Sequence, residues 1–153
     1  MIIREGKIED FPLLEWAWKD DRVVQQKYIS AIQDGKQSFL VVEADEKIIG
    51  EIHLWWVSDN DLEVANEKNR AYLSTFRIHD DHQRKGYGKQ LMMAALDLIK
   101  KKGYTQVTIA SYEGEDEIEE LYKKWGFSEV LRDIVVTDKG GAHSCRLHLK
   151  RLE

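Results

Sequence analysis

Hydrophobic residues recur every three or four positions in two stretches near the start of the chain. This spacing gathers apolar side chains on one helix face, and it predicts helices over about residues 11–19 and 22–33. Asp10 followed by Pro12 is typical of a helix start, so we expect Asp10 to be the N-cap of the first helix. Gly35 marks the end of the second helix.

Extended apolar runs and two further helical patterns fill the rest of the chain. After a short first strand, the expected strands cover residues 38–43, 47–57, 71–78, 105–110, 128–137 and 143–150. Residues 87–102 and a shorter segment that ends at Gly126 have helical periodicity, whereas residues 58–70 are polar and indicate a long loop. The resulting order is α+β in character, with one parallel crossover through the 87–102 helix.

Length and composition limit the class of protein. The 153 residues fit one domain, residues 1–153, and the net charge of −5 argues against a nucleic-acid partner. No apolar run approaches the length of a membrane span, and the N-terminus lacks the apolar core of a signal peptide. Cys145 is the only cysteine, so no internal disulfide is possible. We therefore expect a cytoplasmic protein that binds neither nucleic acid nor membrane.

A basic, glycine-containing turn joins the strand over residues 71–78 to the next helix. The backbone N–H groups of a helix's first turn lack intrahelical partners and attract anions. Gly86 and Gly88 lack a Cβ, so a phosphate can approach the backbone closely, and Arg84, Lys85 and Lys89 add positive charge. This pattern predicts a pyrophosphate-binding site.

Other glycine loops fit the sequence less well. A Rossmann fingerprint needs a third glycine where Leu91 stands, and a Walker loop needs a serine or threonine where Gln90 stands. An ordinary strand-to-helix turn with surface lysines, or an unrelated phosphate-binding domain, is the alternative.

The spacing Gln83-x-x-Gly86-x-Gly88 resembles the pyrophosphate-binding motif of the GNAT superfamily of N-acetyltransferases. Residues 121–127, which read Leu-Tyr-Lys-Lys-Trp-Gly-Phe, are similar to the family's Leu-Tyr-x-x-x-Gly-Phe segment. The resemblance covers about residues 71–130 in detail. It implies the GNAT fold, which is α+β (α/β/α-like) with a mixed, mostly antiparallel sheet of about seven strands and about four helices. It also implies acetyl-CoA as co-substrate and, as acceptor, a small-molecule amine, a protein N-terminus or a lysine.

The resemblance further implies how acetyl-CoA is bound. In the family the strand before the glycine loop splays from its neighbour, and its free backbone groups pair with the pantetheine arm. The residues expected to bind acetyl-CoA are Phe76, Arg77, Ile78, Gln83, Arg84, Lys85, Gly86, Tyr87, Gly88 and Lys89. One position departs from the family: Glu115 stands where an asparagine often contacts the pantetheine, and an ionised carboxylate cannot donate a hydrogen bond.

Tyr122 lies where the family often has a tyrosine that protonates the thiolate of coenzyme A, although it also belongs to an apolar helix stripe. The general base is left open: Glu51, His53, Glu63 and His79 are candidates, and ordered water can serve instead. No metal is expected, because His79-x-x-His82 sits in a turn without a third ligand.

The acceptor is less well determined. The acidic loops over residues 59–67 and 113–120 would suit a cationic acceptor. Trp55 and Trp56 point to opposite faces of an extended strand, so one can be core while the other lines an acceptor pocket or a homodimer contact. A non-catalytic acyl-CoA sensor on the same fold is the alternative function.

Overall fold

A computed structural model describes residues 1–153. In chain order the elements are β1 (Ile2–Glu5), the 3₁₀ helix η1 (Ile8–Leu14), α1 (Glu15–Trp18), α2 (Arg22–Gln33), β2 (Gln37–Ala44), β3 (Lys47–Trp55), β4 (Arg70–Ile78), the 3₁₀ helix η2 (Asp80–His82), α3 (Tyr87–Lys101), β5 (Gln106–Tyr112), α4 (Asp116–Lys124), β6 (Glu129–Asp138) and β7 (Gly141–Arg151).

The seven strands form one sheet in the order β1-β2-β3-β4-β5-β7-β6. Every neighbouring pair is antiparallel except β4 and β5, which are parallel and are joined through α3. The predicted fold class is therefore confirmed: the sheet is mixed and mostly antiparallel, with four α-helices and one parallel crossover.

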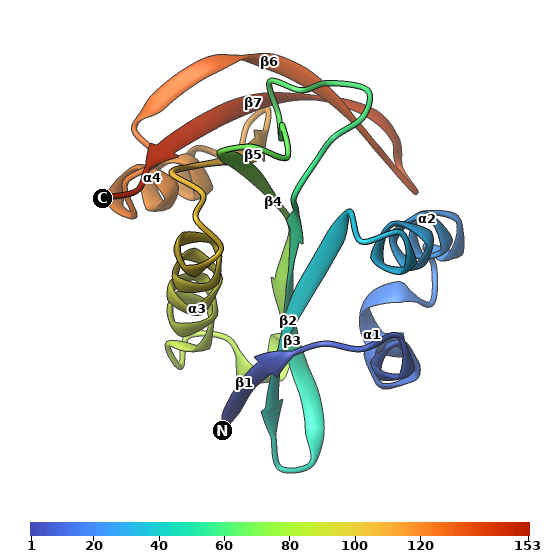
Figure 1. Ribbon diagram of the computed structural model, residues 1–153. Helices are drawn as coiled ribbons and strands as arrows, with labels where there is room; N and C mark the ends of the chain where they lie inside the picture. Colours follow the sequence, from blue (N-terminus) through green and yellow to red (C-terminus); the bar gives the residue numbers. More distant parts are fainter.

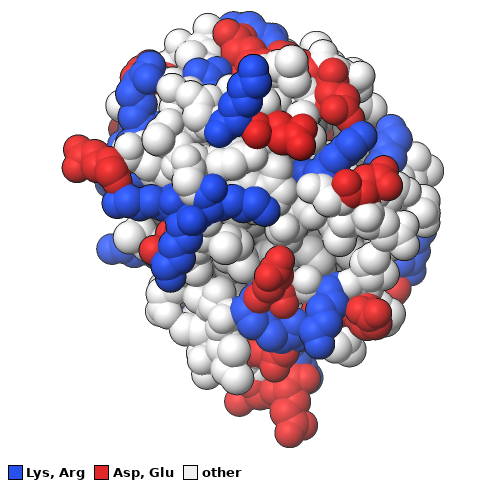
Figure 2. All heavy atoms as spheres, in the orientation of Figure 1, with Lys and Arg blue, Asp and Glu red and all other residues white.

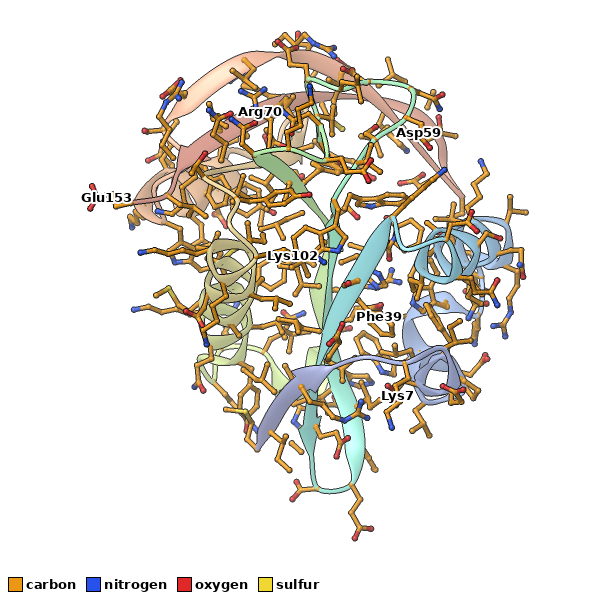
Figure 3. All side chains as sticks on the ribbon, viewed as in Figure 1. Lys7, Phe39, Asp59, Arg70, Lys102 and Glu153 are labelled. Carbon is orange, nitrogen blue, oxygen red and sulfur yellow. The ribbon has the colours of Figure 1, made fainter.

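Helices cover both faces of the sheet (Figure 1). On one face α3 and α4 pack over a cluster of 18 buried residues, which includes Leu73, Leu91 and Phe127. On the other face η1 and α1 cover a smaller cluster that contains Trp18 and Phe39, with residues of α2 packed against it. Side chains fill the space between sheet and helices on each face (Figure 3). The β6–β7 hairpin arches over the top of this arrangement in Figure 1.

The start of the chain differs from the sequence-based expectation. The helix expected over residues 11–19 is a 3₁₀ helix over Ile8–Leu14 followed by a single α-helical turn. Asp10 lies inside the 3₁₀ helix and is buried, so its prediction as N-cap of a helix beginning at residue 11 is wrong. Its carboxylate instead accepts two hydrogen bonds of 2.8 Å from Arg4 and one from the Lys7 backbone N–H. An ion pair to β1 therefore fixes this segment.

No helix of the structure is both long enough and apolar enough to cross a membrane.

Candidate active site

A β-bulge interrupts β4 halfway along its length. On β3, Glu51 pairs with Arg77 and His53 pairs with Ser74, so two steps on β3 correspond to three on β4. Thr75, in the bulge, has a φ of +50°. Such a backbone conformation is rare for a β-branched residue and costs of order 1–3 kcal/mol. The surrounding sheet must therefore hold it in place.

The bulge changes which side chains of β4 face each helix layer. Because strand side chains alternate, an extra residue reverses the alternation beyond it. Phe76 and Ile78 consequently pack against the core under α3 and α4, on the same face as Leu73. Arg77 turns to the opposite face and lies 4.5 Å above the ring of Trp18. One strand therefore contributes different chemistry to the two sides of the sheet.

β4 and β5 separate where the bulge begins. Their parallel pairing ends at Leu73 and Ile109, although β4 continues to Ile78 and β5 to Tyr112. A cleft of about 820 Å³ opens at this point. Its walls come from α2, the unpaired ends of β4 and β5, α4, the loop after β3 and the β6–β7 hairpin. The open strand edges leave backbone groups available to an extended ligand.

The basic turn lies at the far end of β4 and leads into α3. Gly86 is the N-cap of α3 with a φ of +83°, and Arg84 is also left-handed with a φ of +63°. A Cβ on Gly88 would lie 3.5 Å from the ring of Phe76, which is ordinary contact. The side chains of Arg84, Lys85 and Lys89 come from exposed residues. This turn therefore combines free helix N–H groups with three positive charges.

The exposed side chain of Gln83 connects the turn to the end of β4 through hydrogen bonds. Its side-chain amide donates to the carbonyl of Ile78 at 3.0 Å and to the carboxylate of Asp80 at 3.2 Å. Tyr87, which follows Gly86, is half-buried and packs against the core under α3. These two residues hold the turn against the end of β4.

Tyr122 lies in the last turn of α4 and lines the cleft, with 8% of its surface exposed. Its ring packs near Trp125 and Phe127. Burial, together with the nearby charge of Glu115, raises the pKa of the Tyr122 phenol above its ordinary value. The phenol is protonated at neutral pH with or without this shift, and burial makes it a weaker acid.

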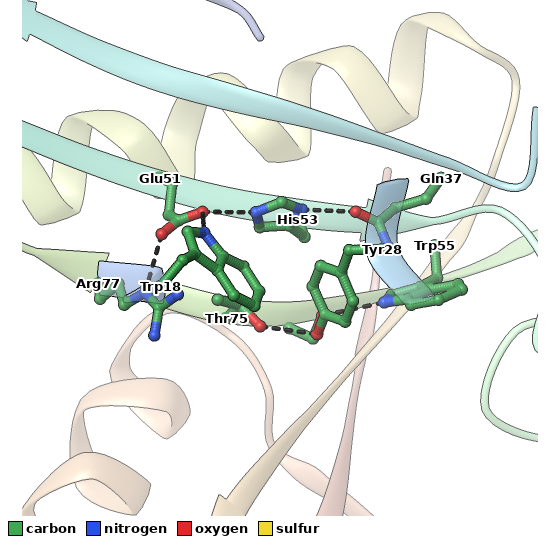
Figure 4. A network of polar contacts seen from close by, with 9 residues as sticks. Trp18, Tyr28, Gln37, Glu51, His53, Trp55, Thr75 and Arg77 are labelled. Carbon is green, nitrogen blue, oxygen red and sulfur yellow. Dashed lines mark hydrogen bonds and ion pairs between the residues drawn. The ribbon is translucent and has the colours of Figure 1, made fainter. Parts of the chain in front are cut away.

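A buried polar network lies behind the cleft on the face covered by α1 and α2 (Figure 4). Glu51 Oε1 accepts hydrogen bonds from the Trp18 indole at 3.0 Å and from His53 Nε2 at 2.6 Å, and Oε2 accepts one from Arg77 at 2.8 Å. His53 Nδ1 lies 2.5 Å from the Gln37 amide. Burial lowers the pKa of His53, although the Glu51 carboxylate acts in the opposite direction. Burial opposes ionisation of Glu51, but His53 and Arg77 outweigh it and the pKa of the carboxyl is lowered.

The two carboxylates suggested as general bases do not line the cleft. Glu51 is fully buried, and its oxygens are occupied by the network. Glu63 is exposed in the loop after β3 and forms an ion pair with Arg132 of β6. The geometry does not bring either carboxylate to the point where β4 and β5 separate. His53 is equally buried, and His79 lies beyond the end of β4.

The side chain of Glu115 forms a hydrogen bond within the loop between β5 and α4. Its carboxylate accepts a hydrogen bond of 2.7 Å from the backbone N–H of Tyr112, at the open end of β5. The side chain also lines the cleft. A carboxylate at this position therefore binds a main-chain donor of the chain itself.

The comparisons with known proteins agree with this architecture. A family model described as the acetyltransferase (GNAT) family matches residues 3–127. This chain belongs to the GNAT family. The match confirms the resemblance seen in the two motifs and the predictions of an acetyltransferase that uses acetyl-CoA. No individual curated protein matches the chain in sequence.

Solved structures share the fold across the whole chain. A ribosomal-protein-alanine N-acetyltransferase from Brucella melitensis has a TM-score of 0.75 and 15% identity, covering 99% of this chain and 100% of that one. A GNAT family acetyltransferase from Elizabethkingia anophelis with acetyl-CoA bound has a TM-score of 0.70 and 16% identity, with 99% and 97% covered. A spermidine N-acetyltransferase from Vibrio cholerae has a TM-score of 0.72 and 18% identity, with 99% and 95% covered. At these identities the similarity shows the fold.

Sequence reasoning missed several residues of the GNAT cleft. Tyr28 of α2 and Thr75 of the bulge line it and are hydrogen-bonded to each other at 2.7 Å. Their sequence patterns predicted only a helix face and a strand. Trp55 lines the cleft, whereas Trp56 is buried and packs on Tyr104, which fulfils the expectation that the two face opposite sides.

Proposed function

We propose that this GNAT protein transfers the acetyl group of acetyl-CoA to a primary amine by direct attack within a ternary complex. The observation that carries this proposal is the separation of β4 and β5 after Leu73 and Ile109, which opens a cleft lined by Tyr122 on the strand that leads to the basic turn before α3. An extended pantetheine arm fits such an edge, because the arm carries amides that pair with backbone groups. The pyrophosphate then meets the N–H groups of residues 84–89.

In this proposal the bulge stabilises the negative charge that develops on the thioester during the reaction. The amine nitrogen attacks the thioester carbon, so a C–N bond forms and the C–S bond breaks. Negative charge develops on the carbonyl oxygen during attack, and a backbone N–H near Thr75 or Phe76 stabilises it. The rigid, strained backbone at Thr75 suits this role, because an oriented donor needs no reorganisation during the reaction.

Two protons must move. Tyr122, which lines the cleft, donates its phenolic proton to the departing thiolate. The attacking amine loses its proton to water, because neither Glu51 nor Glu63 lines the cleft, and carboxylates that do, such as Asp59 and Glu115, accept hydrogen bonds from the protein. The acceptor class remains that predicted from the sequence: a small-molecule amine, or a protein N-terminus or lysine. Two of the fold neighbours are an acetyltransferase of spermidine and one of a ribosomal-protein alanine, and both names indicate amine acceptors. A cytoplasmic location and a homodimer stay predictions.

The test joins cofactor binding to turnover. We expect calorimetry to detect coenzyme A binding to the wild type and strongly weakened binding to Gly88→Glu, since the new carboxylate stands where phosphate binds. Lys100→Gln, which changes the charge equally at the other end of α3, is the matched control and should bind as the wild type does. Incubation with acetyl-CoA and a broad amine panel should release coenzyme A. If acetyl-CoA binds but no amine in the panel causes release of coenzyme A, the protein is an acyl-CoA sensor. Equal affinity of Gly88→Glu and the wild type for coenzyme A would contradict the phosphate site.

A further inference from the structure

Three aromatic side chains form one wall of the cleft on the side covered by α2. Tyr28 comes from α2, Trp55 from β3 and Tyr72 from β4, and all three line the cleft. The rings of Tyr28 and Trp55 meet edge to face at 5.4 Å between centroids. Trp55 and Tyr72 are direct cross-strand partners, so their side chains lie side by side on the same face of the sheet. We call this set the aromatic wall.

The polar groups of Tyr28 and Trp55 are already hydrogen-bonded within the protein. The Tyr28 hydroxyl lies 2.9 Å from Ser74 Oγ and 2.7 Å from Thr75 Oγ1. The Trp55 indole N–H donates to Ser74 Oγ at 3.0 Å (Figure 4). Since these polar tips are bound to the bulge, the rings offer apolar surface to a ligand. The bulge therefore joins the aromatic wall to the point where acetyl transfer is proposed.

The carboxylates around the cleft are mostly bound to groups of the protein. Asp59 forms an ion pair with Lys36 at 2.6 Å, and Asp61 forms one with Arg132. Asp138 accepts a hydrogen bond from the Tyr112 hydroxyl at 2.8 Å. On the face in Figure 2, basic side chains are interspersed with acidic ones. The ion pairs of Asp59 and Asp61 weaken the support that the loop over residues 59–67 gave to a cationic acceptor, whereas Asp138 accepts from a neutral phenol and keeps its charge.

The rim of the cleft restricts large acceptors. Arg132 of β6 reaches across to Asp61 and Glu63, so it ties the loop after β3 to the β6–β7 hairpin. A folded protein surface would have to break these contacts to bring an amine to the bulge. A small molecule can enter without breaking them.

We propose that the acceptor is a small primary amine carried on an aromatic or similarly sized apolar group, which packs against the aromatic wall. This inference rests on the proposed function and narrows its acceptor. Burial of such a group against three rings favours it over a polyamine, which has no apolar group of that size to pack against the rings.

The test compares kcat/KM for 2-phenylethylamine, ethylamine and spermidine at saturating acetyl-CoA. We expect 2-phenylethylamine to exceed both others by at least about tenfold, as burial of a phenyl group in an apolar pocket implies. The preference should not fade as salt rises. A folded protein with an exposed N-terminal amine, included in the panel, should be a poor acceptor.

Variants of the aromatic wall test the cause of the preference. Trp55→Leu should lower the ratio of kcat/KM for 2-phenylethylamine to that for ethylamine by about tenfold. Tyr72→Leu serves the same purpose if Trp55→Leu fails to fold. Leu62→Ala, in the loop after β3 and exposed, removes an apolar side chain outside the cleft and should leave the ratio unchanged.

The outcomes separate this inference from the proposed function. A preference for spermidine or for the folded protein overturns the inference while acetyl transfer to amines stands. The same holds if wild-type kcat/KM is equal for 2-phenylethylamine and ethylamine. The inference is also overturned if Trp55→Leu and Tyr72→Leu both keep the wild-type ratio of kcat/KM for 2-phenylethylamine to that for ethylamine. If coenzyme A binds but no amine in the panel releases it from acetyl-CoA, both the inference and the proposed function fail.

Discussion

Replacing Glu51 by glutamine should destabilise the fold strongly, although the two side chains have the same size. In the wild type Oε1 accepts hydrogen bonds from both Trp18 and His53, and Oε2 accepts one from Arg77. An amide has only one acceptor oxygen. In either orientation of the new amide, its NH₂ group replaces an acceptor oxygen. At least one of the buried donors therefore loses its acceptor.

The magnitude follows from burial. A buried donor left without an acceptor costs about 1–3 kcal/mol, and removal of one partner from a buried ion pair costs about 3–5 kcal/mol. The Arg77 side chain is 31% exposed and keeps part of its hydration, so the lower end applies. We expect the free energy of unfolding to fall by about 3 kcal/mol. With an unfolding entropy of about 2.1 cal/mol/K per residue, this corresponds to a Tm lower by about 9 °C.

Calorimetric and urea unfolding at pH 7 measure the loss. Glu120→Gln, which removes an exposed carboxylate of α4, is the matched control and should change stability by less than about 0.5 kcal/mol. The pKa of Glu51 is lowered in the folded protein, so its contribution is complete above the ordinary value of about 4.3 and is lost at lower pH. The gap between wild type and Glu51→Gln should thus narrow below about pH 4. A loss under 1 kcal/mol at pH 7 would refute the account of this network.

Three further predictions follow from the same structure. Tyr122→Phe should reduce kcat by about 10²- to 10⁴-fold with unchanged coenzyme A affinity, whereas Tyr104→Phe, outside the cleft, should keep wild-type turnover; equal rates in steady-state assays where chemistry is limiting would exclude Tyr122 as the acid. Asp10→Asn should cost about 2 kcal/mol at pH 7 in urea unfolding, and less below about pH 4, because hydrogen bonds from Arg4 lower the pKa of this carboxyl despite its burial; a pH-independent loss would contradict this. Gly86→Ala should cost about 1 kcal/mol in the same assay, since the site has a φ of +83°, and an unchanged midpoint would show that the turn relaxes.

The sequence predicted the elements whose pattern is local and strong. The helix expected over residues 87–102 is observed over Tyr87–Lys101, and the last two strands, expected over residues 128–137 and 143–150, form the β6–β7 hairpin. The apolar stripe of α3 and the turn chemistry around Gly140 and Gly141 sufficed for these. The two motifs also located the basic turn, which follows the end of β4, and Tyr122, which lines the cleft.

The parts that the sequence did not reveal depend on contacts between distant segments. Nothing in the run Arg70–Ile78 marks a bulge, because it contains no glycine and has the composition of a regular strand. Glu51 was a plausible base on the strand pattern alone. Its burial is decided by α1, whose Trp18 donates to it, and by the bulge that turns Arg77 toward it. Asp10 was mistaken for an N-cap since its partner, Arg4, lies in a separate strand.

The bulge at Thr75 also has a consequence for how this protein can diverge. Its extra residue assigns Phe76 and Ile78 to the large core and Arg77 to the small one. The two walls of the cleft therefore belong to packing clusters that share few side chains, and substitutions in one should combine additively with substitutions in the other. Acceptor selectivity can then drift through residues such as Trp55 while the acetyl-CoA side is conserved. Straightening the bulge without removing a residue would end this independence, because each β4 residue after Thr75 would change face and Arg77 would enter the apolar layer beneath α3.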